Sequence, residues 1–576
     1  VKLPLVMNEQ RVFVPRLYHI LSGLVRDTNQ IIDKDILTAF LNEYQEHSPL
    51  SIRELYAIPP ILQIVLVEHF GKLIDHSIES LHEYEDAERV YKNIKKEITK
   101  TSRYEFSKVT SDLASKYSII PLSFGFYLFQ KLSQEGSVMR PVIKWIKLNF
   151  EKQGVDSREL ADLESKQRNA NSVIASNSIE SLHWLTQARW DDIVQEINVV
   201  DAILSKDPVG AYPLMDTESR NIYRRTIVRI AERAGIHEAE VARSAVRLCA
   251  GSLSDSRKKE VHGEVRSHVG FYLLDKGRSE LEHKIGYKQS WKDVLYTFFT
   301  QEPDKKYFGI ALSVNMLMTA GAVGYMASFV GNPFFIALGG ALFFFVNSEI
   351  TLNLLNVIIS RFLPVRRLPR LDLTKGISDR QRTFVVIPSM LRSVEGVSDM
   401  VRKLEIRYLA NPEDNIFYAV LLDSKDSKEE FAELDPVLVE TVEKQIEALN
   451  KKYGIREKKF YFLYRKRVWN PSEGLFMGWE RKRGKLREFN MLLSGKKGTT
   501  YVNESVFSHV PQIRYVITLD EDTELPKESA RKLIGCIDHP LNKPVLSGDR
   551  VERGYGIIQP SVSVRLASAT KSLFSR

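Results

Sequence analysis

The sequence turns from an apolar strand to a cluster of carboxylates within one short segment, Val516-Ile-Thr-Leu-Asp520-Glu-Asp522-Thr-Glu-Leu-Pro526. Residues i and i+2 of a strand share one face, so Asp520 and Asp522 are expected to project together at the end of the strand. Two such carboxylates can hold one hard divalent cation, which in turn binds a diphosphate. A solvated acidic turn is the alternative interpretation of this motif taken alone.

The residues on either side of this segment alternate between strands and helices from about Arg382 onward. We expect strands at 383–388, 418–423, 459–464 and 515–520, and helices at 394–409, 436–452 and 527–538. This alternation predicts a mostly parallel α/β sheet with helices on both faces. Such sheets bind ligands at the carboxyl ends of their strands, which is where Asp423, Asp520 and Asp522 fall.

Two further residues of this region are candidates for ligand contact. Asp423 closes the second strand, where a carboxylate can accept hydrogen bonds from a ribose or a base; a cap or turn aspartate is the alternative. The basic block 481–490 follows a stretch bracketed by Trp469 and Trp479. Its glycine would let the backbone approach a phosphate, and Lys485 is predicted to contact a diphosphate.

A basic solvated face or an RNA-binding patch is the alternative interpretation of block 481–490. The nearby acidic strand end would repel a phosphodiester backbone, so we expect no nucleic-acid partner. An Asp-x-Asp pair at a strand end is instead the arrangement of glycosyltransferases that use nucleotide sugars. Inverting sugar transfer needs a carboxylate base. None of the acidic residues after Asp522 lies in a sequence pattern typical of a catalytic base, so the base is expected beyond Arg576. Separately, a further strand is predicted at 555–560.

Residues 1 to about 300 have the apolar periodicity of helices, for example at 51–70, 178–202 and 217–248. Ser51 and Glu54 form a capping-box pattern at the start of the first of these segments. A helical region with a charged surface is interpreted as a packing or regulatory module rather than as a second active site.

A membrane hairpin is predicted after this helical region. Residues 307–330 carry no charge and are long enough to cross a bilayer. A second apolar segment runs over 334–346 and 351–359, interrupted at Glu349, where it either continues or turns into an interfacial helix. A buried hairpin of a soluble core is the alternative. Basic residues flank both ends of the hairpin, which predicts that both flanking regions face the cytoplasm.

Length and composition agree with this organisation. With 576 residues the chain is too long for one core, and we expect a helical region at 1–300, a membrane hairpin at 301–365 and an α/β domain at 366–576. The net charge of +9 suits anionic partners. Cys249 and Cys536 give neither a disulfide framework nor a metal spacing, which fits a reducing compartment. A start at Val1 without a signal peptide suggests a piece of a longer protein.

Several short motifs are spread along nearly the whole chain. The α/β region contains Arg367-Leu-Pro-Arg-Leu-Asp, Val386-Ile-Pro, Phe417-Tyr-Ala-Val-Leu-Leu-Asp, Trp469-Asn-Pro, Met477-Gly-Trp-Glu-Arg-Lys-Arg-Gly-Lys-Leu, Thr518-Leu-Asp-x-Asp-Thr and Gly556-Ile-Ile-Gln-Pro. Upstream of it lie Asn177-Ser-Ile-Glu-Ser-Leu, Asp207-Pro-Val-Gly-Ala-Tyr, Arg220 to Arg225 and His268-Val-Gly-Phe-Tyr-Leu-Leu. With these motifs the chain resembles the glycosyltransferase portion of cyclic β-1,2-glucan synthases, and the block that begins at Met477 is the most specific part of the resemblance.

The resemblance implies a GT-A-type (Rossmann-like) transferase in the bacterial inner membrane that builds and cyclises β-1,2-glucan from UDP-glucose. It implies Mn²⁺ or Mg²⁺ held by Asp520 and Asp522, a nucleotide contact from Asp423 and a diphosphate contact from Lys485. The expected partners are UDP-glucose, the growing glucan and the lipid bilayer. Glu521 stands where the family is expected to have a small residue; on a strand it would point to the opposite face. A polysaccharide synthase of another linkage and a non-catalytic nucleotide-binding scaffold are the alternatives.

Overall fold

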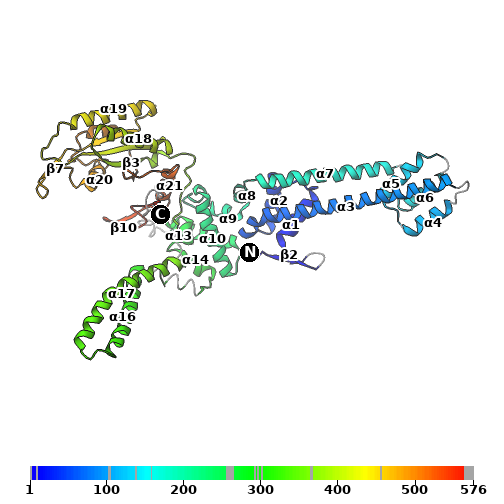
Figure 1. Ribbon diagram of the computed structural model, residues 1–576, viewed down its shortest axis with the longest axis horizontal. Coiled ribbons are helices and arrows are strands. Elements are labelled where there is room, and N and C mark those ends of the chain that lie inside the picture. Colours follow the sequence, from blue (N-terminus) through cyan, green and yellow to red (C-terminus); the bar gives the residue numbers. More distant parts are fainter. Residues whose placement is uncertain are drawn as a thin grey trace. The chain divides into compact units, whose positions relative to one another are not determined.

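The computed structural model describes residues 3–7, 11–100, 106–117, 119–136, 139–156, 159–254, 265–290, 294, 298–299, 302–362, 367–454, 457–510 and 512–563. The chain divides into two compact units, Val1–Ala202 and Ile203–Arg576, shown in Figure 1. The division falls within the region that the sequence predicts to be helical. The boundaries expected near residues 300 and 365 stay predictions.

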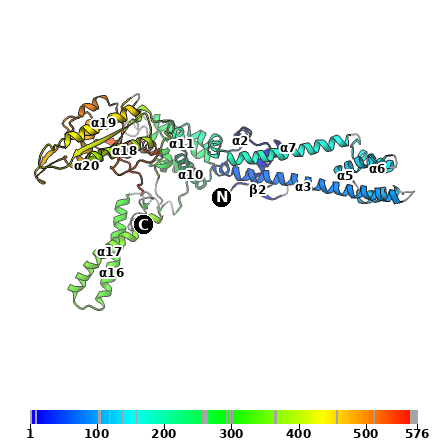
Figure 2. The same cartoon turned by 45° about the horizontal axis from the view of Figure 1, so that its top comes forward.

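The first unit is helical, as predicted, except for a small antiparallel hairpin of β1 (Leu5–Met7) and β2 (Phe13–Pro15). One apolar cluster joins α1, α2, the start of α3, the end of α7, and α8; a second joins the far part of α3 to α4, α5 and α6. The helices α3 and α7 lie side by side (Figure 1 and Figure 2). The bounds of these helices are α1 (Arg16–Asp27), α2 (Lys34–His47), α3 (Ile52–Lys100), α4 (Phe106–Lys116), α5 (Leu122–Ser133), α6 (Arg140–Lys152), α7 (Leu160–Gln187) and α8 (Trp190–Ile197).

The predicted capping box at the start of α3 is confirmed. The Ser51 amide donates to Glu54 Oε2 at 2.9 Å, and the Glu54 amide donates to Ser51 Oγ at 3.3 Å. Arg16 of α1 also donates to Glu54, from Nε at 3.0 Å and from Nη2 at 2.8 Å. Glu54 is fully buried. One carboxylate therefore satisfies the first turn of α3 and ties α1 to it.

Three helical segments are long and apolar enough to cross a membrane among the described residues: Ile52–Lys96 of α3, α16 (Pro303–Ala327) and Pro333–Arg361 of α17 (Pro333–Phe362). The sequence analysis predicts the last two but not the first. In α3 the side chains of Leu55, Ile58 and Leu62 are fully buried in the protein core, whereas Ile64 and Val67 further along the helix are 53% and 56% exposed. The membrane hairpin of α16 and α17 stays a prediction.

The hairpin helices contact each other through polar and small residues. Asn347 Nδ2 donates to Asn315 Oδ1 at 2.7 Å, and both side chains are buried between the helices. Gly340 faces α16 closely, because a Cβ there would lie 2.7 Å from Val323 Cγ2. Small residues and cross-helix hydrogen bonds are what hold helices together in lipid. α17 runs unbroken through Glu349 to its end, so the described residues show no turn there.

The second unit opens with helices that meet around a buried polar cluster. His268 Nδ1 lies 2.7 Å from Asp207 Oδ2, and His268 Nε2 lies 2.8 Å from the Tyr223 hydroxyl. The motifs at 207–212 and 268–274 thus meet in space. The helices of this part are η2 (Tyr212–Leu214), α10 (Thr217–Ala234), α11 (Glu238–Ser254), α13 (Val269–Leu274) and α14 (Arg278–Ile285), and α9 (Val199–Leu204) spans the boundary between the units.

A parallel sheet forms the core of the α/β part, as predicted. It contains β3 (Thr383–Leu391), β4 (Ile416–Ser424), β5 (Phe460–Tyr464) and β8 (Tyr515–Thr518) in the order β5-β4-β3-β8. β4 is buried along its whole length and β3 along most of it, which is typical of central parallel strands. One face packs against α18 (Val394–Ala410), α19 (Asp435–Tyr453) and α21 (Ser529–Ile537), and the other against α20 (Arg481–Leu493).

Two small antiparallel pairs accompany the sheet: β6 (Val468–Asn470) with β7 (Leu475–Met477), and β9 (Val545–Ser547) with β10 (Arg550–Arg553). The strand predicted at 555–560 is wrong, because the described chain after Arg553 contains no strand. Gly554, at φ 73°, turns the chain out of β10, and the Tyr555 amide then donates to the Asn542 carbonyl at 2.9 Å.

Contacts within the second unit join its helices to the α/β part. The Arg370 amide donates to Ser219 Oγ at 2.8 Å, and the Arg370 guanidinium pairs with Asp216 and Glu218 at the start of α10. His539, which follows α21, is fully buried, with its ring 5.2 Å from that of His268. The motif at 367–372 therefore serves as a structural joint.

This joint predicts a pH effect on stability. Burial lowers the pKa of His539 well below its ordinary 6.5, and the nearby His268 and Lys543 act in the same direction. The unfolded chain binds a proton below about pH 6.5 that the folded chain excludes, so the stabilising effect is present above that pH and is lost as pH falls. As pH falls below about 6.5, the free energy of unfolding of the wild type should decrease by up to about 1.4 kcal/mol more per pH unit than that of His539→Gln. Unfolding midpoints in detergent at about pH 7.5 and about pH 5.5 measure this; equal losses in both proteins would contradict it.

Candidate functional site

The acidic segment leaves the sheet earlier than the sequence predicts. β8 ends at Thr518, and the Leu519 amide makes a last bond to the Val386 carbonyl of β3 at 3.0 Å. Pro388 lies two residues after Val386 and therefore faces the same neighbouring strand. Proline has no N–H to continue the ladder, so pairing stops at this point.

Asp520 and Asp522 consequently lie in a turn rather than on the strand. The Thr523 amide donates to the Asp520 carbonyl at 3.0 Å and closes this turn. The prediction that the two carboxylates share a strand face is wrong, as is the interpretation that Glu521 points to the opposite face, because the strand has already ended. Both predicted metal ligands are nevertheless exposed at the carboxyl edge of the sheet.

A buried arginine holds this turn from α18. Arg407 Nη2 donates to the carbonyl oxygens of Asp520, Glu521 and Thr523, at 3.3, 2.8 and 2.8 Å. Arg407 is only 5% exposed, so these bonds are made inside the protein. The backbone of the acidic turn is therefore fixed while its carboxylates stay in contact with solvent.

Asp423 lies at the end of β4 and is buried in a cluster of charges. Arg465 grips it with two bonds, Nε to Oδ1 at 2.7 Å and Nη2 to Oδ2 at 2.9 Å. Lys485 Nζ lies 3.1 Å from Asp423 Oδ2 and donates to the Ser389 carbonyl at 2.6 Å. Burial lowers the pKa of the Lys485 ammonium, and Asp423 only partly offsets this effect. The structure thus brings together two of the predicted site residues, Asp423 and Lys485.

The basic block is the helix α20 and not a phosphate-binding loop. Gly484 lies in its first turn, where a Cβ would be 1.9 Å from the Trp479 carbonyl oxygen. The interpretation that this glycine admits a phosphate is wrong, because the protein's own backbone fills that space. On the same helix Lys482 pairs with Asp520, so α20 carries one lysine to each acidic strand end.

The sheet order sets the spacing of these groups. Asp423 lies at the end of β4 and Asp520 follows β8, with β3 between the two strands, so these residues stand about 10 Å apart across the edge. No group of three or more His, Cys, Asp or Glu side chains that could hold a metal occurs among the described residues. Asp520 and Asp522 still suit Mg²⁺ or Mn²⁺, because such ions commonly take one or two carboxylates and complete their shell with phosphate oxygens and water.

Sequence reasoning missed Arg465, Arg407 and Lys482. Arg465 directly follows a predicted strand, so the rule that identified Asp423 could have identified it as well. Arg407 lies in the last turn of α18, where a basic residue is common, and Lys482 lies among several basic neighbours. Nothing local in the sequence distinguishes these two residues from surface cations.

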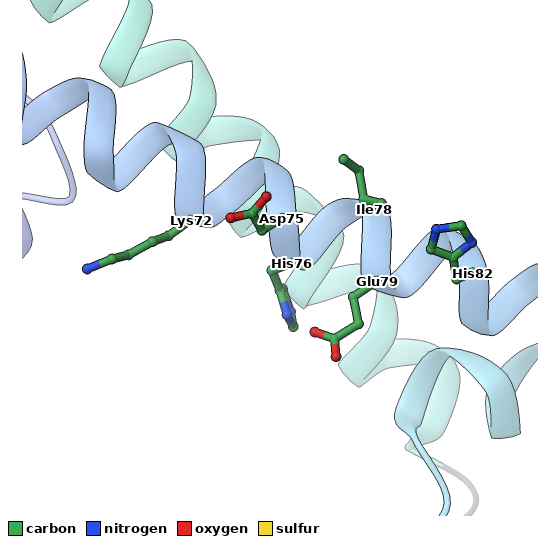
Figure 3. A pocket seen from close by; sticks show the side chains of 6 residues that line it. All are labelled: Lys72, Asp75, His76, Ile78, Glu79 and His82. Carbon is green, nitrogen blue, oxygen red and sulfur yellow. The ribbon is translucent and has the colours of Figure 1, made fainter.

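Two surface hollows lie elsewhere, in the first unit. The one in Figure 3 has a volume of about 520 Å³ and is lined by Lys72, Asp75, His76, Ile78, Glu79 and His82. All six residues come from α3, and in Figure 3 they point in different directions. They do not converge on one point as catalytic or metal-binding residues do.

A parallel sheet whose carboxyl edge gathers opposite charges, in one chain whose described residues include three membrane-length helices, is the architecture of a membrane-associated α/β protein. No family model matches the chain. The chain is 31% identical over 577 residues, or 98% of its length, to the cyclic beta-(1,2)-glucan synthase NdvB of Rhizobium meliloti (strain 1021). It spans 20% of the length of that protein. The chain is therefore a homologue of cyclic β-1,2-glucan synthases, and the resemblance indicated by its motifs is confirmed.

The packing of α20 makes a prediction about two helical glycines. Gly484→Ala should destabilise the protein by about 3 kcal/mol, because a backbone oxygen blocks the new methyl group and cannot move aside cheaply. Gly396→Ala in α18 is the matched control, since its Cβ would meet only Ser393 Oγ, at 3.4 Å, and should change stability by less than about 1 kcal/mol. Chemical unfolding of both variants measures the difference. Equal effects would show that Gly484 is not a packing requirement.

Proposed function

We propose that the chain is the donor-binding part of a membrane glucosyltransferase that extends a β-1,2-glucan from UDP-glucose with inversion, in a metal-dependent reaction. The observation that carries this proposal is the carboxyl edge of the sheet, where an exposed acidic pair and a buried Asp-Lys pair stand on either side of β3. Homology to NdvB supports the class of product. A GT-A-type fold is part of the proposal.

Asp520 and Asp522 would hold a divalent cation together with the donor diphosphate. The cation, when bound, neutralises charge on the leaving nucleotide. Lys482 already lies on Asp520 and would add positive charge beside the same phosphates. Arg407 holds the backbone of the turn that carries the two carboxylates. The backbone beneath these charges is thus fixed before the ligand arrives, which favours electrostatic stabilisation.

Asp423 would contact the nucleoside of the donor, and Lys485 would contact its diphosphate. Lys485 has three N–H donors, of which the Ser389 carbonyl and Asp423 take two, so the third can donate to a phosphate oxygen. Both side chains are almost fully buried, with exposures near 5%. The donor must therefore enter close against the ends of β3 and β4.

The remaining parts of the proposal concern the membrane. The α16–α17 hairpin would place the α/β part at the cytoplasmic face of the inner membrane, where UDP-glucose and the growing glucan meet. The first 300 residues would serve as a packing or regulatory module. A synthase of another linkage would use the same donor residues, so linkage analysis of the product separates the two. A non-catalytic scaffold would bind nucleotide without turnover.

The acidic turn offers a matched pair of substitutions. Asp522→Ala in the full-length enzyme should lower glucose incorporation from labelled UDP-glucose by at least about 100-fold, because a metal ligand is lost. Glu521→Ala removes the neighbouring carboxylate but leaves the proposed ligands, and it should retain most activity. Wild-type rates in Asp522→Ala, or equal losses in both variants, would contradict the assignment.

A further inference from the structure

One fully buried cation joins three elements of the proposed site. Arg465 follows β5 and is 1% exposed. Besides its two bonds to Asp423 of β4, its Nη1 donates to the Trp479 carbonyl at 3.0 Å and its Nη2 to the Arg481 carbonyl at 3.1 Å. Nη1 also lies 3.6 Å from Glu488 Oε2 on α20. Arg465 therefore links the end of β4 to the entry of α20.

The entry to α20 is strained in the place that Arg465 holds. Glu480 and Arg481 are consecutive non-glycine residues with φ of 46°, in the left-handed region that such residues rarely adopt. Strain of this kind persists only where the surroundings impose it, and it collects at functional sites. The two carbonyls to which Arg465 donates, those of Trp479 and Arg481, bracket Glu480.

The first two turns of α20 carry the lysines that contact the acidic strand ends. Lys482 contacts Asp520, and Lys485 contacts Asp423 and the Ser389 carbonyl. The residue at which α20 begins and the rotation of the helix about its axis determine the positions of both ammonium groups. A planar guanidinium can hold a carboxylate and two carbonyls at once, whereas a lysine ammonium lacks the fork that this requires.

We propose that Arg465 is a positioning residue for the donor diphosphate, acting through the strained entry of α20 on Lys482 and Lys485. This inference rests on the proposed function, because it assigns those lysines to a nucleotide-sugar diphosphate. Arg465 itself touches no ligand in this account. Its role is to fix the distance between the two lysines and the acidic edge.

The chain supplies a matched control two residues away. Arg467 is also a buried arginine, 5% exposed, that pairs with a carboxylate, Asp435, and donates to two carbonyls, those of Lys425 and Glu430. The partners of Arg467 lie outside α20. Arg465→Lys and Arg467→Lys therefore make the same chemical change in the same segment. Only Arg465 is connected through the entry of α20 to Lys482 and Lys485.

The test measures hydrogen exchange of residues 479–486, UDP-glucose affinity with Mn²⁺, and unfolding midpoint for wild type and both variants in detergent. Arg465→Lys should speed exchange in 479–486 and weaken donor binding by roughly 10-fold or more, whereas Arg467→Lys should do neither even where it lowers the midpoint equally. Unchanged exchange in Arg465→Lys, or equal losses of affinity in both variants, would overturn the proposal.

Two further outcomes are informative. If wild type binds no UDP-glucose, the proposed function fails, and the exchange data alone decide whether Arg465 positions α20. If Arg465→Lys does not fold, Gly478→Ala perturbs the same pair while leaving both side chains in place, because its Cβ would lie 2.6 Å from Asp423 Oδ2 and 2.9 Å from Arg465 Nη2. Wild-type affinity and exchange in folded Gly478→Ala would likewise count against the proposal.

Discussion

The buried ion pair between Asp423 and Arg465 is the interaction on which the α/β part depends. With Lys485 and Glu488 it forms a cluster of two cations and two anions, which is electrically balanced within the protein. Removing one member of such a cluster leaves an uncompensated buried charge, at a cost of about 3–5 kcal/mol. The same four side chains come from β4, from the end of β5 and from α20. The same charge cluster therefore holds together the sheet and the edge that carries the proposed site.

The sheet itself could be predicted from the sequence because its strands are almost wholly apolar and alternate with amphipathic helices. The end of β8 could not be placed by that pattern, since Leu519 is as apolar as the strand before it. The decisive residue was Pro388, more than a hundred positions earlier, whose missing N–H faces β8. Strand pairing decides which prolines matter, and pairing is a tertiary property.

The candidate site was predicted in part. Asp423 and Lys485 were assigned separately from their own surroundings, and the structure places them 3.1 Å apart. The role of Gly484 was misinterpreted, because the sequence shows a glycine among basic residues but not the Trp479 carbonyl that occupies the space above it. Arg407 escaped notice because it acts on backbone carbonyls, and backbone acceptors leave no signature in a sequence. Arg465 could have been found, because it directly follows a predicted strand.

The carboxyl edge of the sheet joins an acidic turn held by Arg407, a buried charge cluster held by Arg465, and the lysine-bearing helix α20. We propose that this edge binds a nucleotide sugar through a divalent cation, and this is the central claim. Calorimetric titration of UDP-glucose and of other nucleotide sugars into the protein in detergent, with and without Mn²⁺, tests that claim most directly. The account predicts binding that requires Mn²⁺ and prefers UDP-glucose. No binding, or binding of every nucleotide alike whether or not the metal is present, would contradict it.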